Sequence, residues 1–259
     1  MNLWHDVRFG ARTLRKSPGF AATAMLTLAL GIGATTAIFS VCDAMLWKPA
    51  PLPHLETLVM VLQAGGDPGE WNDATPADVA DIRRGSATLE KFATYEQGMA
   101  NIAATGGEPQ RVEQALVTSN FFEVLGVQPA RGRAFEAGED QPGREREIIL
   151  SDGLWQRRFG ADPNIVGKSV RLDDQDFLIT GVMPPKFDFP LATQLWTPLA
   201  LTAAQWDSRA NQAVQSVGRL KPGSRVENTV AELNAIARRL SDHRHNLSER
   251  KAVRVGYRD

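Results

Sequence analysis

Two short clusters in this sequence carry side chains that could bind a metal ion. His243 and His245 alternate near the C-terminal end, and Asp173, Asp174 and Asp176 lie between two strand-like segments. Imidazole and carboxylate groups are metal ligands, but the histidine pair has no third partner in view, and the aspartates suit a turn. We interpret the histidines as part of a solvated tail and the aspartates as a hairpin turn, and we expect neither a metal site nor a cofactor.

Motifs for the common enzymatic reactions are missing from the sequence. There is no Walker phosphate loop, G-x-S-x-G elbow, H-E-x-x-H helix or paired C-x-x-C, so the chain should not hydrolyse ATP itself. The only cysteine of the 259 residues is Cys42, which excludes an intramolecular disulfide framework. A net charge of −1 offers no basic face for nucleic acid. We therefore expect a protein that is not an enzyme and has no nucleic-acid partner.

The remaining charged and aromatic clusters predict solvated and packed surfaces, with no catalytic constellation. Glu139, Asp140 and the run 144–147 mix both signs of charge, which is typical of a solvated face. Six aromatic side chains could line a ligand groove, although core packing is the default for such residues. They are Trp155, Phe159, Phe177, Phe187, Phe189 and Trp196.

One long apolar segment, residues 18–47, predicts a membrane-spanning helix. From Pro18 through Cys42 no side chain is charged. At ~1.5 Å of rise per residue, a helix of this length exceeds the hydrocarbon core of a bilayer, which is about 30 Å thick. A cleaved signal peptide has a shorter apolar region, and a buried helix of a soluble protein rarely avoids charge for so long.

The flanks of this segment predict its orientation. Residues 1–17 form a basic leader, in which Arg8, Arg12, Arg15 and Lys16 outnumber the single acid Asp6. By the positive-inside rule the leader stays in the cytoplasm, and the chain after about residue 47 lies in the periplasm or another extracytoplasmic space. The protein is therefore expected in the cell (inner) membrane. The leader is either a short helix in the membrane interface or a solvated segment.

Small residues cluster within the predicted span and suggest a helix-packing surface. They are Gly31, Gly33 and Ala37, of which Gly33 and Ala37 fall on one helical face. Small side chains let a second helix approach closely. Because Gly and Ala are common in spans, a helix without a specific partner remains the alternative.

The rest of the chain predicts an α+β domain without internal repeats. Alternating or β-rich apolar patterns predict strands at 56–63, 89–104, 111–118, 148–150, 168–172, 177–183, 213–220 and 252–257. Cap residues and apolar periodicity predict helices at 76–84 after Thr75, at 120–125 between Ser119 and Gly126, at 152–159 between Ser151 and Gly160, and at 226–241.

Ordered blocks along nearly the whole chain resemble the MacB-like ABC transporter permeases. The similarity runs through SPGFAATAMLTLALGIGATTAIFSV, QRVEQALVTSNFFEVLGVQPARGRAFEAGED, IILSDGLWQRRFGADPNIVGKSVRLDDQDFLITGVMP and VGRLKPGSRVENTVAELNAIARRL. Within that family, the chain is most similar to the acidobacterial-type duplicated permeases, which lack a fused ATPase.

This resemblance implies a transmembrane helix followed by a periplasmic core domain over residues 48–259. It implies a porter-like part of β-α-β units, residues 56–127 and 213–257, into which a small α/β lobe, residues 128–212, is inserted. The implied partners are a cytoplasmic ABC ATPase subunit, a second permease copy in a dimer, a periplasmic adaptor or envelope protein, and membrane lipid.

Two functions follow from these patterns. The resemblance implies a permease component of an ABC-type export or mechanotransmission system, whose periplasmic domain moves when a separate cytoplasmic subunit hydrolyses ATP. Because relatives continue into further spans, a chain that ends at Asp259 is expected to be a fragment of such a permease. The alternative is a stand-alone, membrane-anchored extracytoplasmic domain that binds or senses a ligand.

Replacement of Gly33 by isoleucine tests whether the predicted span packs against another helix. A bulky, branched side chain should prevent close approach, so we expect Gly33→Ile to disrupt assembly in detergent, measured by cross-linking and size-exclusion chromatography. Unchanged assembly would place Gly33 toward lipid.

Overall fold

The computed structural model divides the chain into two compact units, residues 1–49 with residue 259, and residues 50–258. It describes residues 52–64, 71–103, 109–209, 214–242 and 253–254, together with the helical positions Gly19 and Thr27. Apart from those two positions, the predicted leader and span lie outside the described residues, as do Gly31, Gly33 and Ala37. Within the described ranges, no helix is both long enough and apolar enough to cross a bilayer.

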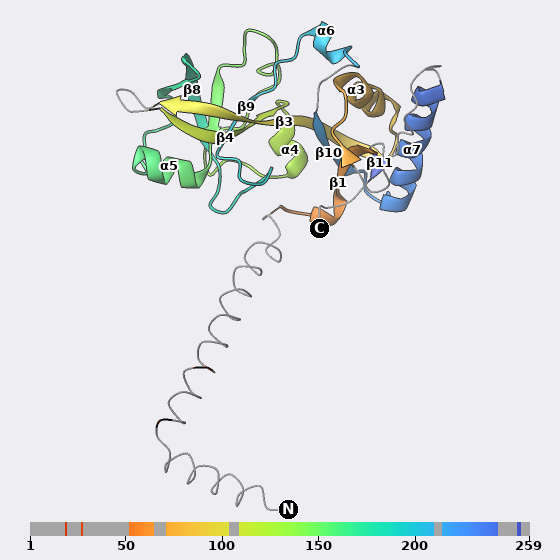
Figure 1. The fold of residues 1–259 in the computed structure, drawn as a ribbon, viewed down its shortest axis with the longest axis horizontal. Helices are drawn as coiled ribbons and strands as arrows, with labels where there is room; N and C mark the ends of the chain where they lie inside the picture. The colour runs from red at the N-terminus through yellow and green to blue at the C-terminus, as the bar shows by residue number, and fades with distance from the viewer. Residues whose placement is uncertain are drawn as a thin grey trace, which may run out of the picture. The chain divides into compact units, whose positions relative to one another are not determined.

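The second unit has a mixed α+β fold built on one sheet (Figure 1). The sheet has the strand order β11-β1-β10-β3-β4-β9-β6-β8-β5, with β2 beside β1 and β7 beside β3 and β8. The strands are β1 (Leu58–Ala64), β2 (Trp71–Asn72), β3 (Leu89–Ala103), β4 (Gln110–Val117), β5 (Arg131–Gly132), β6 (Glu147–Leu150), β7 (Ser169–Leu172), β8 (Gln175–Val182), β9 (Leu195–Pro198), β10 (Gln215–Leu220) and β11 (Val253–Arg254). The helices are η1 (Leu55–Thr57), α3 (Pro76–Gly85), α4 (Phe121–Leu125), α5 (Asp152–Phe159), α6 (Ala203–Trp206) and α7 (Val226–Asp242).

The cap residues of two helices confirm the sequence predictions. At α3, the Thr75 hydroxyl accepts a hydrogen bond from the Asp78 amide at 3.3 Å. At α5, the Ser151 hydroxyl accepts from the Leu154 amide at 3.2 Å, and the helix ends at Gly160. Side-chain caps of this kind satisfy amides that have no partner inside the helix.

The predicted cap of α4 is wrong by one residue. Asn120 occupies the cap position of α4 and makes no side-chain cap bond. The predicted cap residue, Ser119, instead donates its amide to Asp140 Oδ2 at 2.9 Å. The Asn120 side chain is held by the neighbouring strand, because its amide donates to the Phe92 carbonyl at 3.0 Å.

Most predicted strands are confirmed, and the exceptions are local. Strand β1 begins at Leu58 because residues 55–57 form the 3₁₀ turn η1. Strand β9, in the proline-rich segment, has no sequence pattern that predicts it, and it forms by parallel pairing with the distant strand β4. Asp173 and Asp174, both with positive φ, form the predicted turn between β7 and β8, whereas Asp176 belongs to β8.

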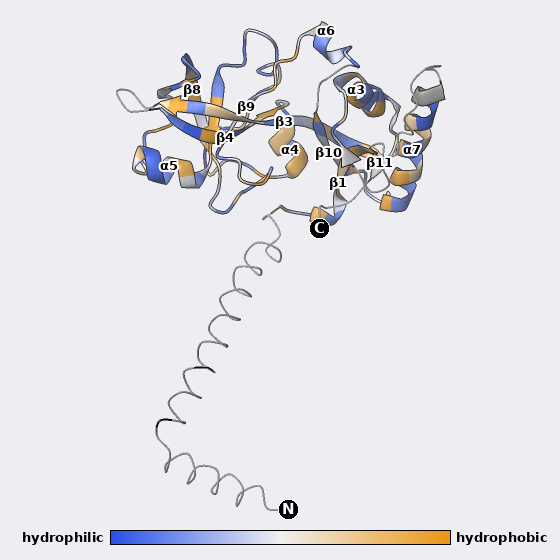
Figure 2. Cartoon of the chain, in the orientation of Figure 1, coloured by the Kyte–Doolittle hydropathy of each residue, from blue (hydrophilic) through white to orange (hydrophobic). Residues whose placement is uncertain are grey.

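Three hydrophobic cores follow one another along the sheet. The helix-side core packs α3 and α7 against β1, β3 and β10, the aromatic core surrounds α4, and the α5 core lies between α5 and the other end of the sheet. Figure 2 shows polar and apolar residues alternating along α7, as a helix with one buried face requires. Residues of β3 enter all three cores, so the predicted division into residues 56–127 with 213–257 and residues 128–212 stays a prediction.

Truncation of Phe122 should destabilise the domain more than truncation of an exposed apolar side chain. Phe122 is fully buried, and the centroid of its ring lies 5.5–6.1 Å from the ring centroids of Phe121, Phe135, Phe187 and Trp196. We expect Phe122→Ala to lower the free energy of unfolding by roughly 3–5 kcal/mol, measured by chemical denaturation. Leu191→Ala, at a side chain 77% exposed, is the control and should change it by less than about 0.5 kcal/mol.

Candidate functional site

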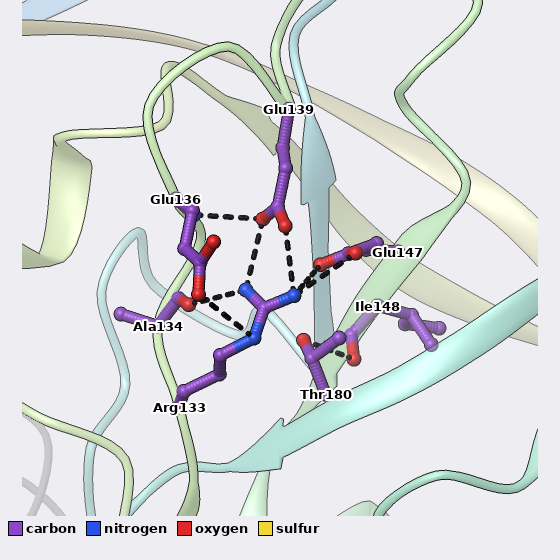
Figure 3. Close-up of polar contacts among 7 residues, drawn as sticks. All are labelled: Arg133, Ala134, Glu136, Glu139, Glu147, Ile148 and Thr180. Carbon is purple, nitrogen blue, oxygen red and sulfur yellow. Dashed lines mark hydrogen bonds and ion pairs between the residues drawn. The ribbon is translucent and has the colours of Figure 1, made fainter.

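Arg133 lies at the centre of a cluster of three ion pairs. Its guanidinium faces three glutamates, one from each side (Figure 3). Nη1 and Nη2 donate to the two carboxylate oxygens of Glu139 at 3.0 and 2.7 Å. Nη2 also donates to Glu147 at 3.0 Å, and Nε lies 3.4 Å from Glu136. The bidentate contact with Glu139 uses the planar fork that distinguishes arginine from lysine.

The backbone around Arg133 approaches strand β8 very closely. The Arg133 amide donates to the Thr180 carbonyl at 2.9 Å. Gly132 precedes it with φ +72°, and a Cβ at this position would lie 2.0 Å from the Thr180 carbonyl oxygen. Only glycine combines that φ with that approach. Glu147, the first residue of β6, reaches the guanidinium from the strand that pairs with β8.

The electrostatics of the cluster shift the pKa values of its two largely buried carboxylates, those of Glu139 and Glu147, in opposite directions. Burial, and then the hydrogen bond and charge of Glu139, raise the pKa of Glu147 to about 7. Burial also opposes ionisation of Glu139, but hydrogen bonds from Arg133 and the Glu136 amide outweigh it and hold the pKa of Glu139 below its usual value. Glu147 is therefore the member of the pair that retains a proton, and Glu139 is the ionised member.

This arrangement corrects the prediction of a solvated face for Glu139 and Glu147, whereas Arg144 and Arg146 are exposed as predicted. The side chains of Glu139 and Glu147 are only 15% and 17% exposed, because both fold onto Arg133. The sequence pattern could not reveal this, since positions 133, 139 and 147 follow no helical or strand spacing. Chemically, the cluster fixes the connector between β5 and β6 to the sheet; it presents carboxylates and a guanidinium, and no nucleophile is among its members.

The aromatic residues singled out in the sequence pack as core. Trp196 is fully buried, and Trp155, Phe187 and Phe189 are at most 9% exposed. Phe159 and Phe177 are half-buried against the α5 core. Sequence reasoning missed Tyr95, Phe121 and Phe122, which complete the aromatic core; Tyr95 meets Phe121 and Phe189 edge to face at 5.6 and 5.7 Å.

The other candidate residues do not converge on a site. Asp173 Oδ1 accepts from the Asn101 backbone amide and side-chain amide, both at 2.9 Å, and so fastens the β7–β8 turn to β3. His243 and His245 lie outside the described residues. Within the described ranges, no group of three or more His, Cys, Asp or Glu side chains could hold a metal ion.

The family model of the MacB-like periplasmic core domain matches residues 21–236. The chain therefore belongs to this family, which confirms the resemblance found in the sequence. A domain of this family implies an inner-membrane protein with a periplasmic part, whereas the duplicated-permease subgroup and the boundary at residue 47 stay predictions.

A curated relative is the macrolide export ATP-binding/permease protein MacB of Burkholderia thailandensis, 31% identical over 86 residues. That match covers 32% of this chain and 13% of the relative, so this chain matches only a small part of that protein's length.

Solved structures share the fold. A domain assigned to a permease protein of Porphyromonas gingivalis aligns with TM-score 0.60 and 15% identity, over 79% of this chain and 92% of that one. The periplasmic region of MacB from Actinobacillus actinomycetemcomitans aligns with TM-score 0.56 and 13% identity, over 76% of this chain and 88% of that one. The extracellular domain of the noncanonic ABC-type transporter YknZ from Gram-positive bacteria aligns with TM-score 0.55 and 16% identity, over 76% of this chain and 98% of that one. These likenesses confirm the mixed α+β fold of this domain family.

Replacement of Glu147 by glutamine should remove a pH dependence of stability. Because the pKa of Glu147 is raised on folding, its contribution to stability is present below its unfolded value of about 4.5 and is lost as the pH rises through about 7. A glutamine side chain at this position would stay neutral throughout. We expect the free energy of unfolding of Glu147→Gln to differ least from that of the parent chain at pH 5 and to be higher by about 1–2 kcal/mol at pH 8, a figure reduced for the partial exposure of the side chain.

Chemical denaturation at pH 5, 6, 7 and 8 measures this difference. Glu136→Gln is the matched control, since the Glu136 side chain is 70% exposed and its contact with Arg133 is longer. A stability difference for Glu147→Gln that stays constant from pH 5 to 8 would contradict the assignment.

Proposed function

We propose that this chain is a membrane permease component of an ABC-type export or mechanotransmission system in the inner membrane. Its periplasmic domain moves in response to ATP hydrolysis by a separate cytoplasmic subunit, and two permease copies work together. The observation that carries the proposal is the family match over residues 21–236.

The architecture of strand β3 supports a role in passing on motion. Its residues pair with β10 at one end, with β4 through the middle, and with β7 at the other end. At about 3.3 Å per residue, its 15 residues extend for roughly 50 Å. A displacement applied at the β1–β10 end is therefore carried to the α5 core by one continuous hydrogen-bonded strand.

Co-purification tests the proposed partner. The complete natural protein that contains this chain, extracted in mild detergent, should retain an ATP-binding subunit with a Walker phosphate loop. Macrolides, named for the B. thailandensis relative, are the first compounds to test for export. Failure to retain any ATP-binding subunit would count against the proposal and favour a stand-alone binding or sensor domain.

Distance measurement between two copies tests the motion. A spin label at the exposed position Arg111, as Arg111→Cys in a cysteine-free background that includes Cys42→Ser, reports on the start of strand β4. We expect ATP to shift the distance between the labels of two copies, and a Lys→Ala variant of the ATPase phosphate loop to abolish the shift. A distance that ATP leaves unchanged would contradict a moving domain.

A further inference from the structure

The first described residues after the predicted span are held by one arginine of a distant strand. We call residues 52–57 the junction segment. Arg219, on β10, donates through Nη1 to Thr57 Oγ1 at 2.7 Å and through Nη2 to the Pro53 carbonyl at 3.5 Å. Its Nε donates to the Val124 carbonyl of α4 at 2.8 Å. One guanidinium therefore connects the junction segment, a helix and a central strand.

Hydrogen bonds within the junction segment close a turn between His54 and Thr57. The Thr57 hydroxyl, which accepts from Arg219, donates to the His54 carbonyl at 2.8 Å, and the Thr57 amide donates to the same oxygen at 3.0 Å. Leu52 is buried in the aromatic core, and Leu55 and Leu58 pack partly against it. The segment is thus anchored by apolar packing on one side and by Arg219 on the other.

The C-terminal end of α4 packs closely against Pro53 of the junction segment and against Arg219. Gly126 has φ +71°, and a Cβ there would lie 3.1 Å from Pro53 Cγ and 3.2 Å from Arg219 Nη2. The helix therefore approaches the junction segment so closely that a side chain at this position would push against it. The guanidinium also lies at the negative end of the helix dipole, where a cation is favoured.

The geometry requires a guanidinium and is not met by charge alone. Two acceptors on the junction segment and one on α4 are reached by Nη1, Nη2 and Nε, which point in fixed, different directions. A lysine ammonium is a single point charge on a flexible stem and cannot span all three.

We infer that Arg219 is a positioning residue that couples the junction segment to α4 and β10, so that a movement of the chain entering at residue 52 displaces the domain as a rigid body. This inference rests on the proposed function. Loss of the Arg219 contacts leaves the domain folded on its three cores and loosens only its connection to the preceding chain.

Hydrogen exchange on the full chain in detergent tests the local part of this inference. Thr57→Val removes the acceptor of Arg219, whereas Thr57→Ser keeps the hydroxyl and is its matched control. We expect amides 55–58 to exchange about tenfold faster in Thr57→Val and Arg219→Lys, and unchanged in Thr57→Ser. The amides of α5 should keep parental rates in all variants, which separates a local effect from general destabilisation. Equal exchange in Thr57→Val and Thr57→Ser would overturn the inference.

The same variants in the complete permease test the coupling. With the Arg111→Cys label, we expect Arg219→Lys and Thr57→Val to keep ATP hydrolysis within about twofold of the parent while the ATP-driven change in label distance is lost. Thr57→Ser should retain it. A parent protein without any ATP-driven change would overturn the proposed function itself; a change that survives in both Arg219→Lys and Thr57→Val would overturn only the role of Arg219.

Discussion

Strand β3 is the constraint on which the rest of this domain depends, because one strand supplies residues to three successive cores. Leu89 and Phe92 enter the helix-side core, Tyr95 enters the aromatic core, and Ala100 and Ile102 enter the α5 core. Strand β3 pairs with β10 along its first half and with β4 along its second half, and it is buried in three places, which restricts its bending between them. We therefore expect the three cores to move together.

Two arginines fasten irregular segments to this frame. Arg133 fixes the connector between β5 and β6 through Glu139 and Glu147, and Arg219 fixes the junction segment through Thr57. The partly buried ion pairs of Arg133 add little net stability, but like the hydrogen bonds of Arg219 they select one arrangement of the groups that they join. For the proposed role in passing on motion, a defined arrangement of connectors matters more than stability alone.

Much of the local structure follows from the sequence, because its signals are local. Thr75 and Ser151 fix helix starts with their own side chains, and Asp173 with Asp174 fixes a turn. The rest depends on contacts between distant residues. Strand β9 exists through parallel pairing with β4, and the burial of Glu147 depends on Arg133; neither leaves a periodic trace in the sequence.

We propose that the three cores form one rigid unit along β3. Labels at the exposed positions Asn228 on α7 and Arg157 on α5 lie beside the helix-side core and the α5 core, and a pulsed magnetic-resonance measurement gives the distance between them. With one labelled copy diluted among unlabelled copies, we expect a single narrow distance distribution that ATP and the cytoplasmic subunit leave unchanged. Two populations, or a distribution that shifts with ATP, would show that the domain flexes between its cores and is not one rigid unit.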